Sequence, residues 1–231
     1  MKNLIILTAL VISCISCRYK SGSGNIITET RKAGNFKSVS ISGGFEVELR
    51  QAPEVEVLVE ADDNLMEYIE TKVRREELVI RLDDLNVHDA HLKVFIAAPS
   101  VNAIKTSAGA ELQVRDMLKS GEAVRLKASS GSQIKTAIDA PEVRADASSA
   151  GNIDISGRTK DFYAETSSGA EILAADLLSE NTEADASSGS TIKVHASVKL
   201  RAKASSGASV RYRGAAVVSK ETSSGGSVEK E

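Results

Sequence analysis

Residues 186–194 read ASSGSTIKV, and the second half of the chain contains seven versions of this nine-residue phrase. The other six are TSAGAELQV from Thr106, ASSGSQIKT from Ala128, ASSAGNIDI from Ala147, TSSGAEILA from Thr166, ASSGASVRY from Ala204 and TSSGGSVEK from Thr222. The seven first residues are separated by 22, 19, 19, 20, 18 and 18 positions. Self-similarity at a short, regular period is typical of repeat proteins, in which each repeat buries its apolar side against the next.

The residues before the phrases alternate between apolar and charged side chains, as in VRLKA (124–128), VRADA (143–147) and LRAKA (200–204). A period of two is typical of β-strands with one buried and one solvated face. Each phrase also carries one aliphatic side chain that we expect to point into the core. These side chains are Leu112, Ile134, Ile153, Ile172, Ile192, Val210 and Val228.

A repeat of about 19 residues cannot bury its apolar face alone. If the chain coils so that each strand lies over its equivalent, at a spacing of about 4.8 Å, the strands form parallel sheets along a solenoid. The sequence therefore predicts an all-β fold, a parallel β-helix (β-solenoid) with about 18–22 residues per turn. The Leu/Asn framework of leucine-rich repeats is absent, and a propeller blade needs about 40 residues.

The Ser-Ser-Gly centre of the phrase predicts a sharp corner, because glycine adopts positive φ angles at little cost. We expect serine hydroxyls at these corners to bond to one another and to the backbone from turn to turn. The composition agrees with a narrow coil. Hydrophobic residues make up 42% of the 231 residues, but aromatic residues only 3%, and there is no Trp.

The first half of the chain continues the alternation over residues 36–105, so we expect it to form the same coil less regularly. The exception is DDNLMEYIET (62–71), where Asp62 or Asp63 can cap a short helix. Leu65, Met66 and Ile69 would share one face of that helix. A short helix near residues 62–71 would cover the apolar end of the coil.

Residues 1–17, MKNLIILTALVISCISC, have the form of a secretory signal: one Lys, an apolar run, then small residues beside cysteines. The apolar run is too short to span a membrane, which takes about 20 residues. Ser16-Cys17 and Ser13-Cys14 both resemble the lipobox of bacterial lipoproteins, in which the Cys is lipidated. We favour Cys17, because the polar stretch RYKSGSGN follows it directly. A signal without a lipid and a Cys14–Cys17 disulfide are the less favoured alternatives.

These observations divide the chain into three parts. We expect a lipoprotein signal peptide over residues 1–17, a flexible tether over 18–34 and the solenoid domain over 35–231. Because the chain after Cys17 lacks cysteine, the exported domain must be stable without disulfides.

The solenoid domain resembles a known family, the head GIN domain, described as "putative auto-transporter adhesin", of exported Bacteroidetes-type proteins. The features that carry the resemblance are FKSV (36–39), GFEVEL (44–49), DNL (63–65) with Ile69, LVI (78–80), and the run from Val94 to Pro99 that leads into IKTSAGA (104–110). The resemblance implies a right-handed parallel β-helix behind a lipoprotein or secretory signal. It brings no catalytic motif.

Residues that could carry chemistry are few, and we predict no catalytic, cofactor-binding or metal site. His88, Asp89 and His91 could contact a metal ion together with Asp83 or Asp84, but no further His or Cys completes a site of known spacing. We expect them in a solvated loop, and His195 on the surface. No Ser lies in a nucleophile elbow. A set of aspartates alternates with Lys and Arg, which is typical of solvated strand faces: Asp139, Asp146, Asp154, Asp161, Asp176 and Asp185.

The charge balance, 29 basic against 32 acidic residues, excludes a strongly basic surface for nucleic acid. We expect a non-enzymatic lipoprotein of the cell envelope, at the outer membrane or cell surface, that acts as an adhesin or binding scaffold. Its partner would be a glycan or another envelope protein, and we expect a monomer without cofactors. Exposed rings for sugar contact are scarce, Tyr163 and Tyr212 being the candidates in the regular half. The alternatives are a polysaccharide-processing β-helix enzyme and a structural or sensory envelope protein without a ligand.

Overall fold

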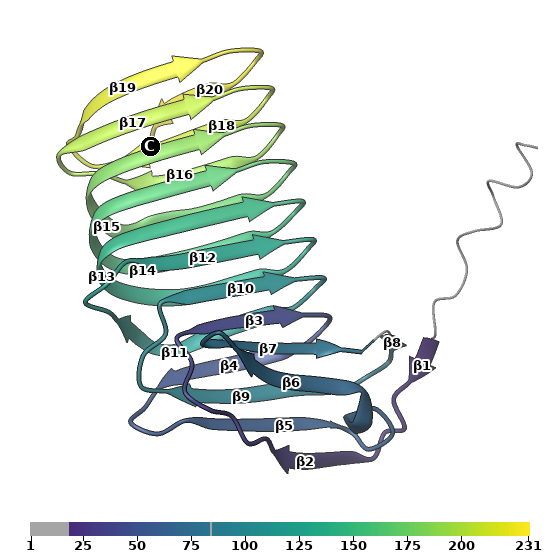
Figure 1. The fold of residues 1–231 in the computed structure, drawn as a ribbon. Helices are drawn as coiled ribbons and strands as arrows, with labels where there is room; N and C mark the ends of the chain where they lie inside the picture. Colours follow the sequence, from purple (N-terminus) through teal and green to yellow (C-terminus); the bar gives the residue numbers. More distant parts are fainter. Residues whose placement is uncertain (1–18, 84) are drawn as a thin grey trace, which may run out of the picture.

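The computed structural model describes residues 19–83 and 85–231, so the signal sequence, Cys14, Cys17 and Asp84 lie outside the described residues. The chain forms a β-solenoid of about six turns (Figure 1). The predicted all-β class and the parallel coil are both confirmed, because successive turns pair in parallel from Ser38 to Lys230.

Two parallel sheets face each other across the core. Sheet I contains β3 (Ser38–Ser42), β10 (Ala103–Ser107), β12 (Val124–Ser129), the second halves of β13 (Gln133–Ser148), β14 (Asn152–Thr166) and β15 (Glu171–Ala186), then β17 (Lys199–Ala204) and β19 (Val217–Thr222). Sheet II contains β4 (Glu46–Gln51), β11 (Glu111–Lys119), the first halves of β13, β14 and β15, then β16 (Thr191–His195), β18 (Ser209–Arg213) and β20 (Ser227–Lys230).

The core follows the predicted inward positions. Ile134, Ile153, Ile172, Ile192 and Val210 stand opposite one another in consecutive strands of sheet II, and each side chain is fully buried. The inward residues of sheet I in the regular half are mostly small, and alanines recur there. This explains the scarcity of rings, because the two sheets leave room for branched and small side chains in most layers.

Each phrase forms the tight corner between the sheets. In five of the phrases the second Ser and the Gly both have positive φ, 54° at Ser130 and 70° at Gly131 for example, as in a type I′ turn. Ala108 takes the place of that Ser in the first phrase, and Ala150 takes the place of that Gly in the third. The N–H of Ser132 donates to the carbonyl oxygen of Ser129 (3.3 Å), which closes the turn. The N–H of Gly131 donates to the oxygen of Ser149 in the next turn (3.1 Å), so the corners are joined by backbone hydrogen bonds.

The prediction for the serine hydroxyls is confirmed for their bonds to the backbone, as between the Ser187 hydroxyl and the carbonyl oxygen of Thr166 in the turn before (3.4 Å). The bonds between hydroxyls are arranged differently from the prediction. The serines at the tip, such as Ser188, are exposed. The buried hydroxyl contacts lie at the base of the corner, between Thr166 and Ser190 (2.8 Å) and between Thr106 and Ser132 (2.9 Å). The backbone of the type I′ turn turns the tip side chains toward solvent, and the residue after Gly toward the core.

The N-terminal end departs from the coil. There β7 (Glu77–Leu82) and β9 (Leu92–Ala98) pair in parallel with β3 and β4, but the next strands are antiparallel. These are β6 (Ile69–Arg74) beside β7, β5 (Glu56–Asp62) beside β9, and β2 (Ile26–Thr30) beside β5. The tight turn at Arg75 and Glu76, both with positive φ, produces the β6–β7 hairpin.

Two sequence predictions for this end are wrong. The helix expected near residues 62–71 is a 3₁₀ turn, η1 (Met66–Tyr68), and Ile69 already begins β6. Asp62 makes no helix cap because its carboxylate accepts hydrogen bonds from Gly24 and His91 instead. The flexible tether expected over 18–34 contains strands β1 (Tyr19–Ser21) and β2, because β1 pairs with β8 (Asn86–His88) and β2 with β5.

The C-terminal end keeps the parallel pattern but changes its side chains. Lys220 stands opposite the buried Ala202, and Lys230 opposite Tyr212, so both lysines occupy core-facing positions of the last turn. The Nζ of Lys220 donates to the carbonyl oxygen of Val228 (3.1 Å) and lies 5.2 Å from the centre of the Tyr212 ring. Tyr212 is only 8% exposed, so its predicted role as a surface ring is wrong.

Candidate functional site

The two histidines of the polar segment before β9, His88 and His91, contact side chains that do not form a set of metal ligands with them. His88 Nε2 lies 2.6 Å from the hydroxyl of Ser21, and His91 Nε2 lies 2.6 Å from a carboxylate oxygen of Glu60. Within residues 19–83 and 85–231, no three side chains of His, Cys, Asp or Glu lie close enough to share a metal ion. His195 ends β16 at the wide corner of the coil and is half-buried rather than fully exposed.

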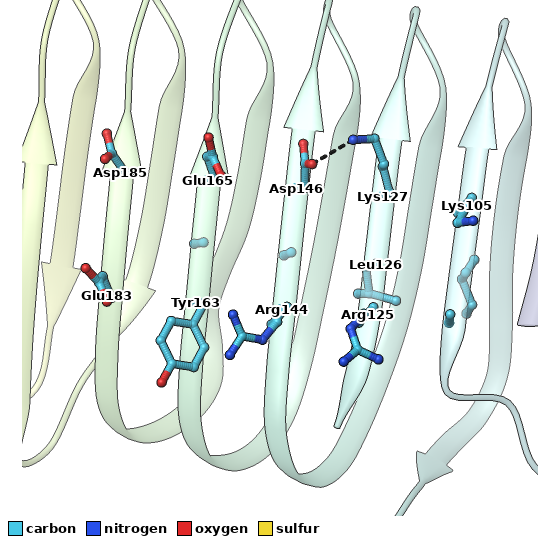
Figure 2. Close-up of a pocket in the computed structure, with 14 residues that line it drawn as sticks. Lys105, Arg125, Leu126, Lys127, Arg144, Asp146, Tyr163, Glu165, Glu183 and Asp185 are labelled. Atoms are coloured by element: carbon cyan, nitrogen blue, oxygen red, sulfur yellow. Dashed lines mark hydrogen bonds and ion pairs between the residues drawn. The ribbon is translucent and has the colours of Figure 1, made fainter. Parts of the chain in front are cut away.

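The outer face of sheet I carries a depression with a volume of about 510 Å³, called here the charged groove. It crosses β10, β12, β13, β14 and β15 (Figure 2). The backbone around four inward residues forms its floor: Ile104, Leu126, Ala145 and Ala164. Two columns of outward side chains form its walls, two residues apart along each strand.

The register of the strands builds both walls. One wall consists of Ala103, Arg125, Arg144, Tyr163 and Glu183, and the other of Lys105, Lys127, Asp146, Glu165 and Asp185. Figure 2 shows the two rows running along the coil. With a strand spacing of about 4.8 Å, four spacings give the groove a length of about 19 Å.

Charge is separated along the groove. The strands nearer the N-terminus carry Lys105, Arg125, Lys127 and Arg144, and those nearer the C-terminus carry Glu165, Glu183 and Asp185. Lys127 is paired with Asp146 (2.8 Å) at the boundary. The groove therefore presents a basic half and an acidic half to any molecule that lies along it.

Tyr163 stands at the junction of the two halves, and its predicted outward position is confirmed. The guanidinium of Arg144 lies 4.2 Å from the centre of its ring, a cation–π contact. Glu142 accepts a hydrogen bond from Arg144 Nε (2.6 Å), and this bond raises the pKa of Arg144. One face of the Tyr163 ring is thus covered by the Arg144 guanidinium, whose position is fixed by its hydrogen bond to Glu142.

Three charged groups of the groove have no partner of their own. Lys105 is paired with Glu77 (2.8 Å), and Glu183 with Arg201 (3.0 Å). In contrast, the side chains of Arg125, Glu165 and Asp185 form no hydrogen bond or ion pair with other residues of the described chain. They are the groups of the groove that a ligand can bind without first breaking a contact.

The dispersed aspartates mostly join neighbouring turns. Besides Asp146, Asp139 pairs with Arg158 (2.6 Å) and Asp154 with Lys135 (3.3 Å). The interpretation of these residues as solvated strand charges is compatible with these contacts, but it missed the groove. Aligning the seven phrases and reading the outward positions down the columns would have found it.

A second charged cluster lies on the outer face of sheet II, where the N-terminal end meets the coil. Glu48 on β4 accepts a hydrogen bond from Arg115 Nε on β11 (2.9 Å) and pairs with Lys93 on β9 (3.1 Å). These contacts, the hydrogen bond from Arg115 foremost, lower the pKa of Glu48 from 4.5 to about 2 against the opposing effect of burial. All three members are paired, so this cluster links strands.

The model of one protein family, "putative auto-transporter adhesin, head GIN domain", matches residues 35–216. The chain belongs to this family. Among solved structures, a protein of Bacteroides fragilis named "putative adhesin" is 16% identical, with a TM-score of 0.83 over 91% of this chain and 98% of its own. A second "putative adhesin", from Parabacteroides distasonis, is 20% identical, with a TM-score of 0.76 over 92% and 100% of the two chains.

A third structure, also from Parabacteroides distasonis, is named "putative lipid binding protein". It is 18% identical, with a TM-score of 0.76 over 93% of this chain and 100% of its own. At these identities the likeness shows that the three proteins share the fold of this chain. No relative is found among curated proteins. In the described part of the chain, no helix has the length and hydropathy needed to cross a membrane.

Proposed function

We propose that the chain is a lipid-anchored, non-enzymatic protein of the cell envelope that binds its partner through the charged groove. The family, whose description includes adhesion, supports a binding role. The observation that carries the proposal is the set of unpaired groups, Arg125 on one side of Tyr163 and Glu165 with Asp185 on the other. The sequence supports attachment through a lipid at Cys17, with Cys14 as the alternative.

The shape of the groove favours an elongated partner. A length of about 19 Å corresponds to about six residues of extended peptide or to a short stretch of a glycan. Such a partner places an anionic group against Arg125 and a cationic or hydroxyl-bearing group against Glu165 and Asp185. The Tyr163 ring offers an apolar surface at the centre, as aromatic side chains do at many binding sites.

The test is a screen of glycans and envelope components with residues 18–231, which include the whole described fold. A ligand that binds in this screen is then titrated against the parent protein, Arg125→Ala and Tyr163→Ala. We expect each variant to weaken binding at least tenfold, and raising the salt concentration to weaken it further, because the contacts are ionic. The matched control is Lys135→Ala, which removes a paired cation from sheet II and should leave binding unchanged. If all three variants bound the ligand as tightly as the parent protein does, the groove would be excluded as the contact surface.

A polysaccharide-processing activity is the second candidate, because Glu165 and Asp185 stand opposite each other on adjacent strands. Two carboxyl groups at such a spacing can serve as acid and nucleophile in glycoside hydrolysis. If the ligand is a polysaccharide, its chain length is measured after incubation with the protein. Cleavage that is lost in both Glu165→Gln and Asp185→Asn would favour the enzyme. An intact polymer favours the binding role.

A further inference from the structure

We propose that the coil stands directly on the membrane, with its N-terminal end at the level of the lipid headgroups and no flexible tether between lipid and fold. This inference rests on the proposed lipid at Cys17 and adds a contact surface and an orientation to it. Two groups of residues carry it. Residues 19–25 are called the anchor segment, and Asp62, Asp63 and Asn64 are called the clamp.

Asp62 is the centre of the clamp, and only 1% of it is exposed. Its Oδ1 accepts a hydrogen bond from the backbone N–H of Gly24 (2.7 Å), and its Oδ2 accepts one from the backbone N–H of His91 (2.7 Å). A buried carboxylate requires such partners, because its burial without them is costly. Asp62 therefore joins the anchor segment to β5 and to the residue before β9.

Asp63 and Asn64 hold the middle of the anchor segment. Asp63 accepts hydrogen bonds from the Ser23 hydroxyl (2.6 Å) and from Asn25 Nδ2 (2.8 Å). These bonds, the one from Ser23 foremost, lower the pKa of the Asp63 carboxyl. The side chain of Asn64 accepts from the N–H of Ser23 (3.1 Å) and donates to the carbonyl oxygen of Ser21 (2.9 Å).

The start of the anchor segment is held as well. β1 pairs in parallel with β8, with Tyr19 opposite Asn86, and Lys20 Nζ donates to the carbonyl oxygen of Asn64 (2.7 Å). Gly22 packs so closely that a Cβ there would lie 2.4 Å from Asp62 Oδ2. The chain is therefore part of the fold from Tyr19 onward.

This placement limits the distance between the lipid and the fold. Cys17 and Tyr19 are two residues apart, so their Cα atoms are separated by at most about 7 Å. A lipidated Cys17 lies at the membrane surface, which brings Tyr19 to the headgroup layer. With the lipid on Cys14, the limit would be about 18 Å, enough for Tyr19 to stay in water.

The side chains at this end fit a headgroup layer of low charge. Tyr19 is 70% exposed and Ile26 is 42% exposed, and tyrosine is enriched at membrane–water interfaces. The described residues of this end also include Asp63 and Glu67, the latter 4.0 Å from Lys20 Nζ, so these described residues do not form a basic patch for anionic lipids. Contact is therefore set by the anchor and by Tyr19.

The orientation follows from the position of the anchor segment, which leads from β1 to β2. In Figure 1, β2 lies at one end of the coil, β1 lies to the side of that end next to β8, and β19 and β20 lie at the opposite end. In sheet I with its hairpin, the order of strands is β6, β7, β3, β10, so the groove begins three spacings from the N-terminal edge, or about 14 Å. Contact between the N-terminal end and the headgroup layer therefore keeps the charged groove above the headgroups, with its opening directed to the side.

Because the chain contains no Trp, single tryptophans report on this geometry. The full lipoprotein with Tyr19→Trp is purified from membranes and reconstituted into phosphatidylcholine vesicles that carry brominated acyl chains. The matched control is Val217→Trp, which places the probe at the far end, where Val217 is 79% exposed. We expect at least twofold quenching for Tyr19→Trp and none for Val217→Trp. In Tyr19→Trp protein with ten Gly/Ser residues inserted between Arg18 and Tyr19, we expect the quenching to disappear while membrane binding persists.

The outcomes separate this inference from the proposed function. Protein that does not float with the vesicles would refute the lipid anchor itself. If the protein binds the vesicles but Tyr19→Trp is not quenched, the lipid anchor stands and the contact of the N-terminal end with the headgroups is refuted. Equal quenching of both probes would show that the coil lies on its side. Quenching that survives the insertion would show that the end binds lipid by itself, against the short connection proposed here.

Discussion

The two ends of the coil close the same kind of core by different means. At the N-terminal end, antiparallel strands continue both sheets, and a buried carboxylate joins them to the anchor segment. At the C-terminal end, the last parallel strands, β19 and β20, pair with the turn below along one edge and leave the other edge open within the described residues, and two lysines occupy positions that are apolar in the turns below. The first end is covered by added structure, whereas the second is protected by charge, as exposed strand edges commonly are. An end that is covered should be sensitive to loss of contacts, and an end protected by charge to loss of that charge.

A substitution in the central core should cause the largest loss of stability, against which the effects at both ends can be compared. Ile153→Asp places a carboxylate in a fully buried layer, so we expect the whole coil to unfold, with a loss of several kcal/mol. Circular dichroism in urea measures it. The control is Asp154→Ala on the outward face of the same strand, which breaks one exposed ion pair and should cost less than about 1 kcal/mol. An unchanged midpoint for Ile153→Asp would contradict the inward assignment.

The N-terminal end is tested with Asp62→Ala, which leaves the N–H groups of Gly24 and His91 without their acceptor. We expect a loss of about 3 kcal/mol. We also expect faster hydrogen exchange over residues 19–30 than over the coil. Asp63→Ala, which removes contacts to the exposed side chains of Ser23 and Asn25 and to the backbone of the adjacent Asn64, should have a smaller effect on both measurements. Equal protection of residues 19–30 in the Asp62 variant and the parent protein would show that β2 is held without the clamp.

The acid response tests the link between this end and the coil. Because the pKa of Glu48 is lowered to about 2, its ion pairs contribute their full stability above about pH 4.5. That contribution disappears as the pH falls through 2. The difference in unfolding free energy between the parent and Glu48→Gln should therefore be below about 1 kcal/mol at pH 7, given the solvent exposure, and vanish near pH 2. Glu111→Gln, an unpaired outward residue of β11, is the control. A difference that grows toward low pH would contradict this sign.

The C-terminal end should show the smallest change in stability and a change in assembly. In Lys220→Val with Lys230→Val, the last turn regains an apolar inner face next to open strand edges. We expect the protein to associate, as seen by sedimentation velocity, with unfolding shifted by less than about 1 kcal/mol. Lys193→Val, on the outward face of an interior strand, should sediment as the parent protein does. A double variant that remains a monomer would show that the lysines have no protective role.

The regular half was open to prediction because its information is local. The period of the phrase and the alternation of residues place Ile153 and Ile172 inside without any knowledge of long-range contacts. The corner was only half predicted. The glycine signal was recognised, but the positive φ of the preceding serine depends on the hydrogen bonds between stacked turns.

The ends and the groove depend on contacts far apart in the chain. Asp62 meets Gly24 and His91 across 38 and 29 residues, and no local pattern distinguishes it from a helix cap. Tyr212, in contrast, was open to prediction: it lies two residues after the inward Val210, so the alternation already points it into the core, opposite Val194. Arg144 and Tyr163 come together only when the strands are aligned, so the groove is a property of register.

The corners have one more consequence, which concerns evolution. Each corner has the same backbone shape, and its backbone N–H donates the same hydrogen bond to the corner of the next turn, so any two neighbouring turns pack together in the same way. Duplicating or deleting one turn, such as residues 147–165, leaves both ends unaltered and changes the height of the coil by about 4.8 Å. Descendants of one gene can thus reach different distances from the same starting surface by copying a single unit.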